Sequence, residues 1–190
     1  MPVRMIRRPP TRPSFVRWGA VTALAALTAC SSPRLTEFPP SCARVAMLGD
    51  AAQLVRYRPG APGEDLTDLM LEGRVAGFKG GCAREDKDTV RTVLTIELQL
   101  ARGPALGGRD AAVPYFVAVR DGDRIRDKQV YNLRVRFPEN QDQIHIVSDE
   151  ITMLMPVNKE KSAASYDVLI GFQLTPEELE ANRRRGPRPQ

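Results

Sequence analysis

The sequence contains a single histidine, His145, and only three cysteines among its 190 residues. A serine or cysteine nucleophile needs a base within hydrogen-bond reach, most often a histidine, so one histidine leaves little room for such catalysis. His145 alternates with apolar neighbours, which places it on the outward face of a strand. The chain also lacks the G-x-S-x-G, H-E-x-x-H and P-loop motifs. We therefore assign no catalytic residue and expect a protein that is not an enzyme.

Metal and nucleic-acid sites find equally little support. There is no C-x-x-C pair, and the carboxylates at residues 64, 65 and 68 lack the spacing of a calcium-binding EF-hand loop. Asp121 and Asp123 flank a glycine in a pattern typical of a hairpin turn. Aromatic residues make up 6% of the chain and lie singly or within strand patterns, so no stacking platform for nucleic acid is visible. We expect no metal, no cofactor and no nucleic-acid partner.

The formal net charge of +5 is confined to the ends of the chain. Residues 1–29 hold five arginines and no acidic residue, and from residue 30 onward 23 basic residues face 23 acidic ones. Four of those arginines lie in the last eight residues, which leaves 19 basic against 23 acidic residues in the body of the chain. The folded part therefore has no excess of basic residues for nucleic acid.

No apolar stretch is long enough to span a bilayer, which takes roughly 20 residues. The uncharged run from Trp18 to Ala29 has 12 residues, follows a segment charged only by arginines and precedes Ser31. This pattern is typical of a secretory signal peptide over residues 1–29. An N-terminal amphipathic or core helix is the alternative. Arg7-Arg8 is followed by two prolines, which departs from the twin-arginine export pattern and favours ordinary Sec export. Translation could start at either Met1 or Met5.

Leu27-Thr28-Ala29-Cys30 resembles the lipobox of bacterial lipoproteins, in which a branched apolar residue and two small residues precede a cysteine. The resemblance implies cleavage between Ala29 and Cys30, a diacylglycerol on the Cys30 thiol and a further acyl chain, such as palmitate, on the new amino terminus. Two or more acyl chains anchor a protein stably in a membrane. Ser31, where aspartate would imply retention in the inner membrane, implies the outer membrane. Membrane lipid is thus an expected partner, and the protein is expected to face the periplasm.

After Cys30, residues 31–41 form a polar segment with three prolines, which disfavours helix and central strand. We interpret residues 30–41 as the lipidated cysteine and a tether. With Cys30 acylated, Cys42 and Cys82 are the two thiols left to pair in an oxidising periplasm. A disulfide between them would close about 40 residues, worth ~4 kcal/mol in the chain-entropy model. Two unpaired core thiols or a metal site are the alternatives.

From Cys42 to Leu174 apolar residues recur with a period of two, which predicts half-buried strands. The parity changes between Ile146 and Ile151, which predicts a bulge or tight turn at residues 148–150. Turn-like segments separate the runs, among them residues 79–88 and 121–123. About seven strands follow, over residues 42–48, 68–78, 89–101, 113–119, 128–137, 143–155 and 166–174. We predict an all-β domain over residues 42–174, a two-sheet antiparallel β-sandwich of immunoglobulin or fibronectin type, with a small barrel as the alternative.

A short helix is predicted after the last strand, within a C-terminal segment 175–190. Thr175, Pro176 and Glu178 form a capping-box pattern with proline at the first helical position. A helix of about ten residues is marginal alone, so we expect Leu179 and Ala181 to rest on the sandwich. The arginine-rich tail that follows either is solvated or contacts an anionic surface.

The layout also resembles a group of uncharacterised alphaproteobacterial lipoproteins over residues 41–183. The segments that carry this resemblance are "SCARVAML", "RGP", "YFVAVRDGDRI" and "YDVLIGFQLTPEELEANR". It implies no activity. Two hypotheses of different class follow: a non-catalytic interaction or structural module of the cell envelope with a protein partner, or a periplasmic module that binds a small ligand or metal in a concave pocket.

Overall fold

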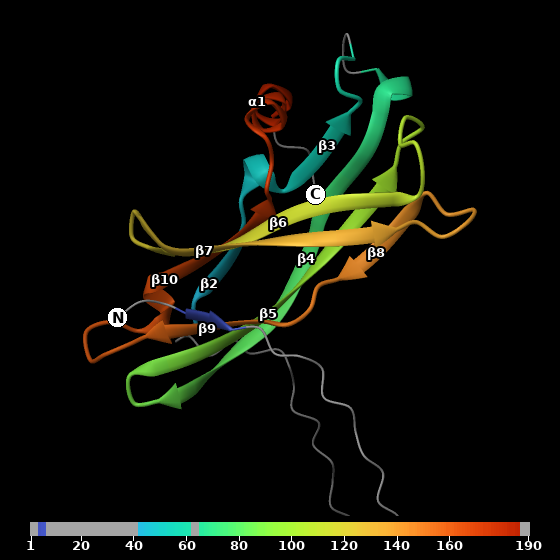
Figure 1. Ribbon diagram of the computed structural model, residues 1–190. Coiled ribbons are helices and arrows are strands. Elements are labelled where there is room, and N and C mark those ends of the chain that lie inside the picture. The colour runs from blue at the N-terminus through green and yellow to red at the C-terminus, as the bar shows by residue number, and fades with distance from the viewer. Residues whose placement is uncertain (1–3, 7–41, 62–64, 187–190) are drawn as a thin grey trace, which may run out of the picture.

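The computed structural model describes residues 4–6, 42–61 and 65–186. Two β-sheets pack face to face, which confirms the predicted β-sandwich (Figure 1). We call the six-stranded sheet A and the four-stranded sheet B. Sheet A has the order β1 (Arg4–Ile6), β9 (Ile151–Pro156), β5 (Thr89–Arg102), β4 (Leu69–Asp86) and β3 (Gln53–Tyr57), and β8 (Gln143–Val147) also pairs with β5. Sheet B has the order β2 (Arg44–Met47), β10 (Tyr166–Phe172), β6 (Asp110–Asp121) and β7 (Arg124–Arg136).

The period-two pattern correctly predicts the buried face of the central strands. In β5, Leu94, Ile96, Leu98 and Leu100 are each at most 1% exposed, and β6 and β10 contribute Val117 and Ile170, both fully buried. One core cluster joins the inward faces of both sheets. Apolar burial of roughly 25 cal/mol per Å² across this interface is the main force that holds the two sheets together.

The parity change before β9 is also confirmed. β8 and β9 both run antiparallel to β5, and they meet it on either side of residues 148–150. Ser148 is buried, and its hydroxyl accepts a hydrogen bond from the Ile96 amide at 3.0 Å while its own amide donates to the Ile96 carbonyl at 2.9 Å. These two bonds satisfy the backbone amide and carbonyl of Ile96, so β5 continues without interruption where its partner changes from β8 to β9.

Three features differ from the sequence prediction. Strand β3 was missed because it does not alternate: its adjacent residues Leu54 and Val55 are both buried. Residues 79–88 are not a turn: β4 continues to Asp86 and only Lys87 and Asp88 reverse the chain. Strand β2 pairs parallel to β10, unlike every other neighbouring pair. The turn predicted at residues 121–123 is present, with Gly122 at a φ of 58°.

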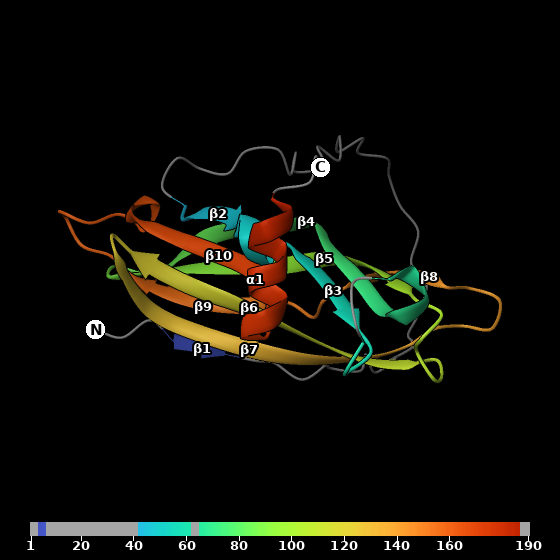
Figure 2. The same ribbon diagram turned by 90° about the horizontal axis from the view of Figure 1, so that it is seen from above.

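The C-terminal helix α1 (Pro176–Arg185) begins with the predicted capping box. The Thr175 hydroxyl accepts a hydrogen bond from the Glu178 amide at 3.2 Å, and the Glu178 carboxylate accepts one from the Thr175 amide at 3.0 Å. The helix lies beside β3 and the 3-10 turn η1 (Gly49–Ala51), as Figure 2 shows from above.

The contact between α1 and the sandwich is largely polar, and no helix residue is fully buried, although Leu179 and Ala181 are half-buried. The Asn182 side chain donates to the backbone carbonyls of Asp50 and Gln53, at 2.9 and 2.8 Å. Arg56 of β3 pairs with Glu178 at 2.9 Å. The expectation that apolar residues dock the helix is therefore incomplete, because hydrogen bonds to backbone carbonyls and an ion pair also hold it to the sandwich.

Candidate functional sites

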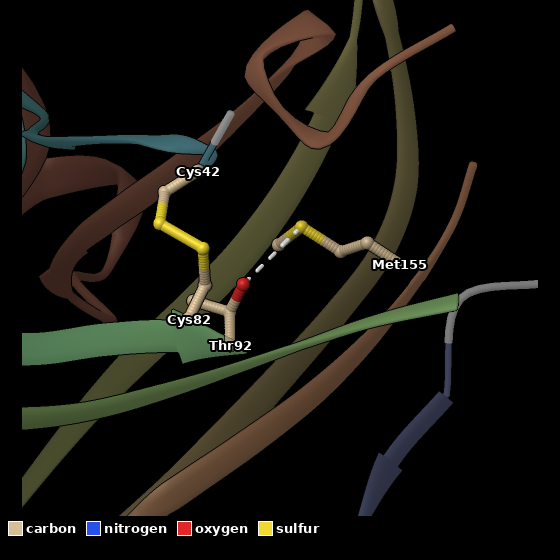
Figure 3. Close-up of a disulfide and its surroundings, with 4 residues drawn as sticks. All are labelled: Cys42, Cys82, Thr92 and Met155. Carbon is tan, nitrogen blue, oxygen red and sulfur yellow. Dashed lines mark hydrogen bonds between the residues drawn. A yellow bond between two sulfur atoms is a disulfide. The ribbon is translucent and has the colours of Figure 1, made fainter. Parts of the chain in front are cut away.

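The predicted lipidation and cleavage residues, Ala29 and Cys30, lie outside the described residues. Cys42 and Cys82 form a disulfide, as predicted, with their Cα atoms 5.8 Å apart. Cys42 lies two residues before the start of β2 in sheet B and Cys82 lies in β4 of sheet A, so the bond joins the two sheets (Figure 3). Beside it the buried Thr92 hydroxyl contacts the Met155 sulfur at 3.7 Å. The pairing is a link between the sheets rather than part of a metal site.

A pocket of about 380 Å³, lined by charged and apolar residues, opens at one end of the sandwich, and we call it the end pocket. Asp121 from the end of β6 meets Arg126 of β7 and Lys161 of the β9–β10 connection there. The Lys161 ammonium also lies 4.3 Å from the ring centre of Tyr166, whose hydroxyl donates to the Pro156 carbonyl at 2.8 Å. The remaining lining residues are Asp88, Val157 and Asn158.

Electrostatics in the end pocket stabilise the charged forms of the central pair. Hydrogen bonds from Lys161 and then from Arg126 hold the pKa of Asp121 below its usual value. The same bond to Asp121 raises the pKa of Lys161. A carboxylate held ionised by two cations is a poor proton donor at neutral pH, so this cluster suits binding of a polar molecule better than acid–base catalysis.

We expect Asp121→Asn to reduce the loss of stability at acidic pH. Because the folded-state pKa of Asp121 lies below the ordinary 3.8, the ionised carboxylate stabilises the fold above that pH. This contribution is lost as the pH falls through the lower folded-state value. Urea unfolding at about pH 7 and about pH 3 should therefore show a smaller decline for the variant than for wild type. Asp123→Asn, in the same turn and exposed, is the control; equal declines for Asp121→Asn and wild type would contradict the prediction.

His145 lies on the outer face of sheet A, as predicted, with 54% of its side chain exposed. Its Nε2 is 3.7 Å from Glu97 Oε2, and the pKa of Glu97 is lowered mainly by a hydrogen bond from Lys79. Of the other candidate carboxylates, Glu64 lies outside the described residues and Asp123 is exposed in its turn, whereas Asp65 and Asp68 have structural partners. Asp65 accepts from the Thr67 amide and hydroxyl, and Asp68 pairs with Arg58. In the described part of the chain no three His, Cys, Asp or Glu side chains gather as a metal site would require.

The sandwich is open, so each sheet has edge strands, and unpaired edges invite a further strand. Three edges are protected. The β3 edge is covered by α1, whose Asn182 side chain donates a hydrogen bond to the Gln53 carbonyl. The β7 edge carries six charged residues among thirteen. Strand β2 has only four residues.

The remaining edge of sheet A is formed by β8 and β9, which both pair with β5, and β9 is protected by neither charge nor helix. Its sequence Ile-Thr-Met-Leu-Met-Pro contains no charged residue. In the full chain residues 4–6 pair with it as β1, antiparallel, so part of the predicted signal peptide occupies this edge. The sequence pattern could not reveal this exposure, because it depends on strand order.

Among the described residues no helix is long and apolar enough to cross a membrane. Comparison with protein-family models, with curated proteins and with solved structures finds no match to this chain.

Proposed function

We propose that this protein is a lipoprotein of the bacterial cell envelope, cut before Cys30 and held by acyl chains on that residue. The observation that carries the proposal is the segment Leu27–Cys30, placed directly after a 12-residue uncharged run and an arginine-rich start. The disulfide between Cys42 and Cys82 supports export, because such bonds persist in oxidising compartments. The anchored domain would face the periplasm, with the outer membrane favoured by Ser31.

Within the envelope, the domain acts as a non-catalytic module that binds another protein or supports the envelope structurally. Two observations favour this role over catalysis. The only histidine pairs with a carboxylate on an exposed sheet face, and the candidate acids Asp65, Asp68 and Asp121 are engaged by amides or cations. Once cleavage before Cys30 removes residues 4–6, the uncharged β9 edge offers backbone groups for pairing with another strand.

Cys30→Ala tests the anchor. Wild-type protein should sediment with membranes and have the mass of residues 30–190 plus acyl chains, whereas the variant should lose the acyl mass and either stay uncleaved or be released as a soluble protein. Fractionation followed by intact-mass measurement distinguishes these forms. Ser31→Ala, which leaves the cysteine and the three residues before it unchanged, is the control for processing. Equal acylation and membrane recovery for wild type and Cys30→Ala would rule out the anchor.

A second candidate function is supported by the end pocket. A periplasmic module that binds a small ligand needs a concave site with a few convergent polar groups, and the pocket brings together Asp121, Lys161 and Asn158 over about 380 Å³. Opposite charges side by side would suit a small polar molecule with both an acidic and a basic group. A bound molecule in the native mass spectrum of the purified protein would distinguish this candidate from the first.

A further inference from the structure

We propose that the mature protein pairs with a second copy of itself, edge to edge, along β9. The inference rests on the proposed function, because the edge becomes free only when cleavage before Cys30 removes residues 4–6. In the full chain these residues pair antiparallel with Leu154, Met153 and Thr152. The edge therefore receives an antiparallel strand in the full chain. Removal of residues 4–6 would expose β9, which like the neighbouring edge strand β8 has no Asp, Glu, Lys or Arg and no covering helix.

The backbone of β9 presents hydrogen-bonding groups toward this open side. The Val157 amide donates to the Asp88 carbonyl at 2.8 Å across the β5–β9 pair. Bonded and non-bonded pairs alternate in antiparallel strands, so Met155 and Met153 direct their amides and carbonyls toward β5. The groups of Thr152 and Leu154 consequently point outward. Pro156 has no amide hydrogen, which limits the outward donors of β9 to these two residues.

Charges at the two ends of β9 make a second copy a complementary partner. Asp149 and Glu150 precede the strand, and a turn that carries Lys159, Glu160 and Lys161 follows it, with no charged residue over Ile151–Pro156. In an antiparallel pair the start of one strand meets the end of the other. If Leu154 lies opposite Leu154 of the second copy, the acidic start of one strand faces the turn at residues 158–161 of the other, which has a formal net charge of +1. Opposite charges in such positions favour the register, whereas β7 edges of two copies would set like charges against each other.

The symmetry of this pairing also suits two molecules on one membrane. Two identical antiparallel strands in a continuous sheet are related by a two-fold axis perpendicular to the sheet. Sheet B covers one face of sheet A, so both B sheets lie on the same side of the joined A sheets. Cys42, where the tether meets the domain, precedes a strand of sheet B. Both tethers thus leave from the same side, as two anchors in one bilayer require.

Cross-linking of the full chain in its native bacterial membrane tests the dimer. In the Leu154→Cys variant, the two introduced cysteines would form a hydrogen-bonded pair with their Cα atoms about 5.5 Å apart. The other cysteines are blocked, two by the disulfide and Cys30 by the proposed acylation. A short bismaleimide should therefore give a band of twice the mature mass. Thr152→Cys is the matched control. In the same register the two introduced cysteines would be offset by four residues, about 13 Å along the strands, and should not cross-link.

Leu154→Lys gives an independent readout, because it places two ammonium groups opposite each other at the two-fold axis. Sedimentation of the protein extracted in mild detergent should show self-association about tenfold weaker or more. Val147→Lys on exposed β8 is the control and should leave self-association unchanged. Circular dichroism checks that each variant is folded.

The outcomes separate the two proposals. A chain that keeps residues 1–29 in the membrane would overturn the proposed processing and, with it, the dimer. A processed and acylated chain that stays monomeric and does not cross-link through residue 154 would overturn the dimer alone. Cross-linking of Leu154→Cys to a different protein, without a product of twice the mature mass, would likewise overturn the second copy as the occupant of the edge.

Discussion

Replacing both Cys42 and Cys82 by serine is expected to lower the free energy of unfolding by ~4 kcal/mol. The disulfide closes a loop with a sequence separation of 40, and the chain-entropy model gives about this value for a loop of that length. Against a typical total of about 5–15 kcal/mol for a domain, the loss is large enough to unfold a sizeable fraction of the protein on mild heating.

The place of the bond in the fold adds to its effect. Strand β2 has four residues and pairs only with β10, so few backbone bonds hold the beginning of the domain. Cys42 is buried, and its bond to β4 is the covalent link between this short strand and the opposite sheet. Without it we expect residues 42–47 to detach before the core opens, because β10 retains its pairing with β6.

Urea unfolding of the oxidised wild type and the double-serine variant measures the difference. Wild type in excess dithiothreitol is the matched control, since it loses the same bond without any substitution, and it should unfold near the variant's midpoint. Hydrogen exchange should show the first loss of protection in β2. If the double variant unfolds at the same urea concentration as oxidised wild type, the bond does not constrain the unfolded chain as the entropy model requires.

Elements whose residues carry a repeated local pattern could be predicted from the sequence. Strand β5 alternates over fourteen residues, and β6 and β10 place apolar residues at every inward position, so burial follows directly from parity. The capping box of α1 is equally local, because Thr175 and Glu178 bond to each other's backbone. Strand order, by contrast, depends on which turns bring distant strands together, and the parallel pairing of β2 with β10 spans more than a hundred residues.

The candidate sites depend on such long-range contacts, which explains why the sequence pattern missed them. Asp121 was correctly placed beside a turn, but its partner Lys161 lies 40 residues later in a different connection. The open edge of β9 likewise follows from its position at the side of sheet A, not from its own residues alone. The one signal available in advance was composition: a strand of six uncharged residues in a chain with 27% charged residues.

The glycine pair Gly80-Gly81 was predicted to form a turn and instead lies inside β4, where the two residues have different roles. A Cβ atom added at Gly80 would lie 2.2 Å from the Val93 carbonyl oxygen and 3.2 Å from the Leu94 Cα, both in the backbone of β5. At Gly81 a Cβ would meet nothing within 4 Å. Gly80 is therefore required for the close approach of the two longest strands, whereas Gly81 is not.

We expect Gly80→Ala to destabilise the protein by roughly 1–3 kcal/mol or more, because the clash is with backbone that cannot rotate away and β4 must separate from β5. Gly81→Ala, one residue along, should be neutral or stabilise by up to about 1 kcal/mol, since alanine lowers the entropy of the unfolded chain. Urea unfolding of the two variants side by side measures the difference. Equal stability would mean that β4 and β5 can separate at this position at no cost. In that case the β4–β5 pairing, which also positions Cys82 for its disulfide, would be looser than the close contact at Gly80 implies.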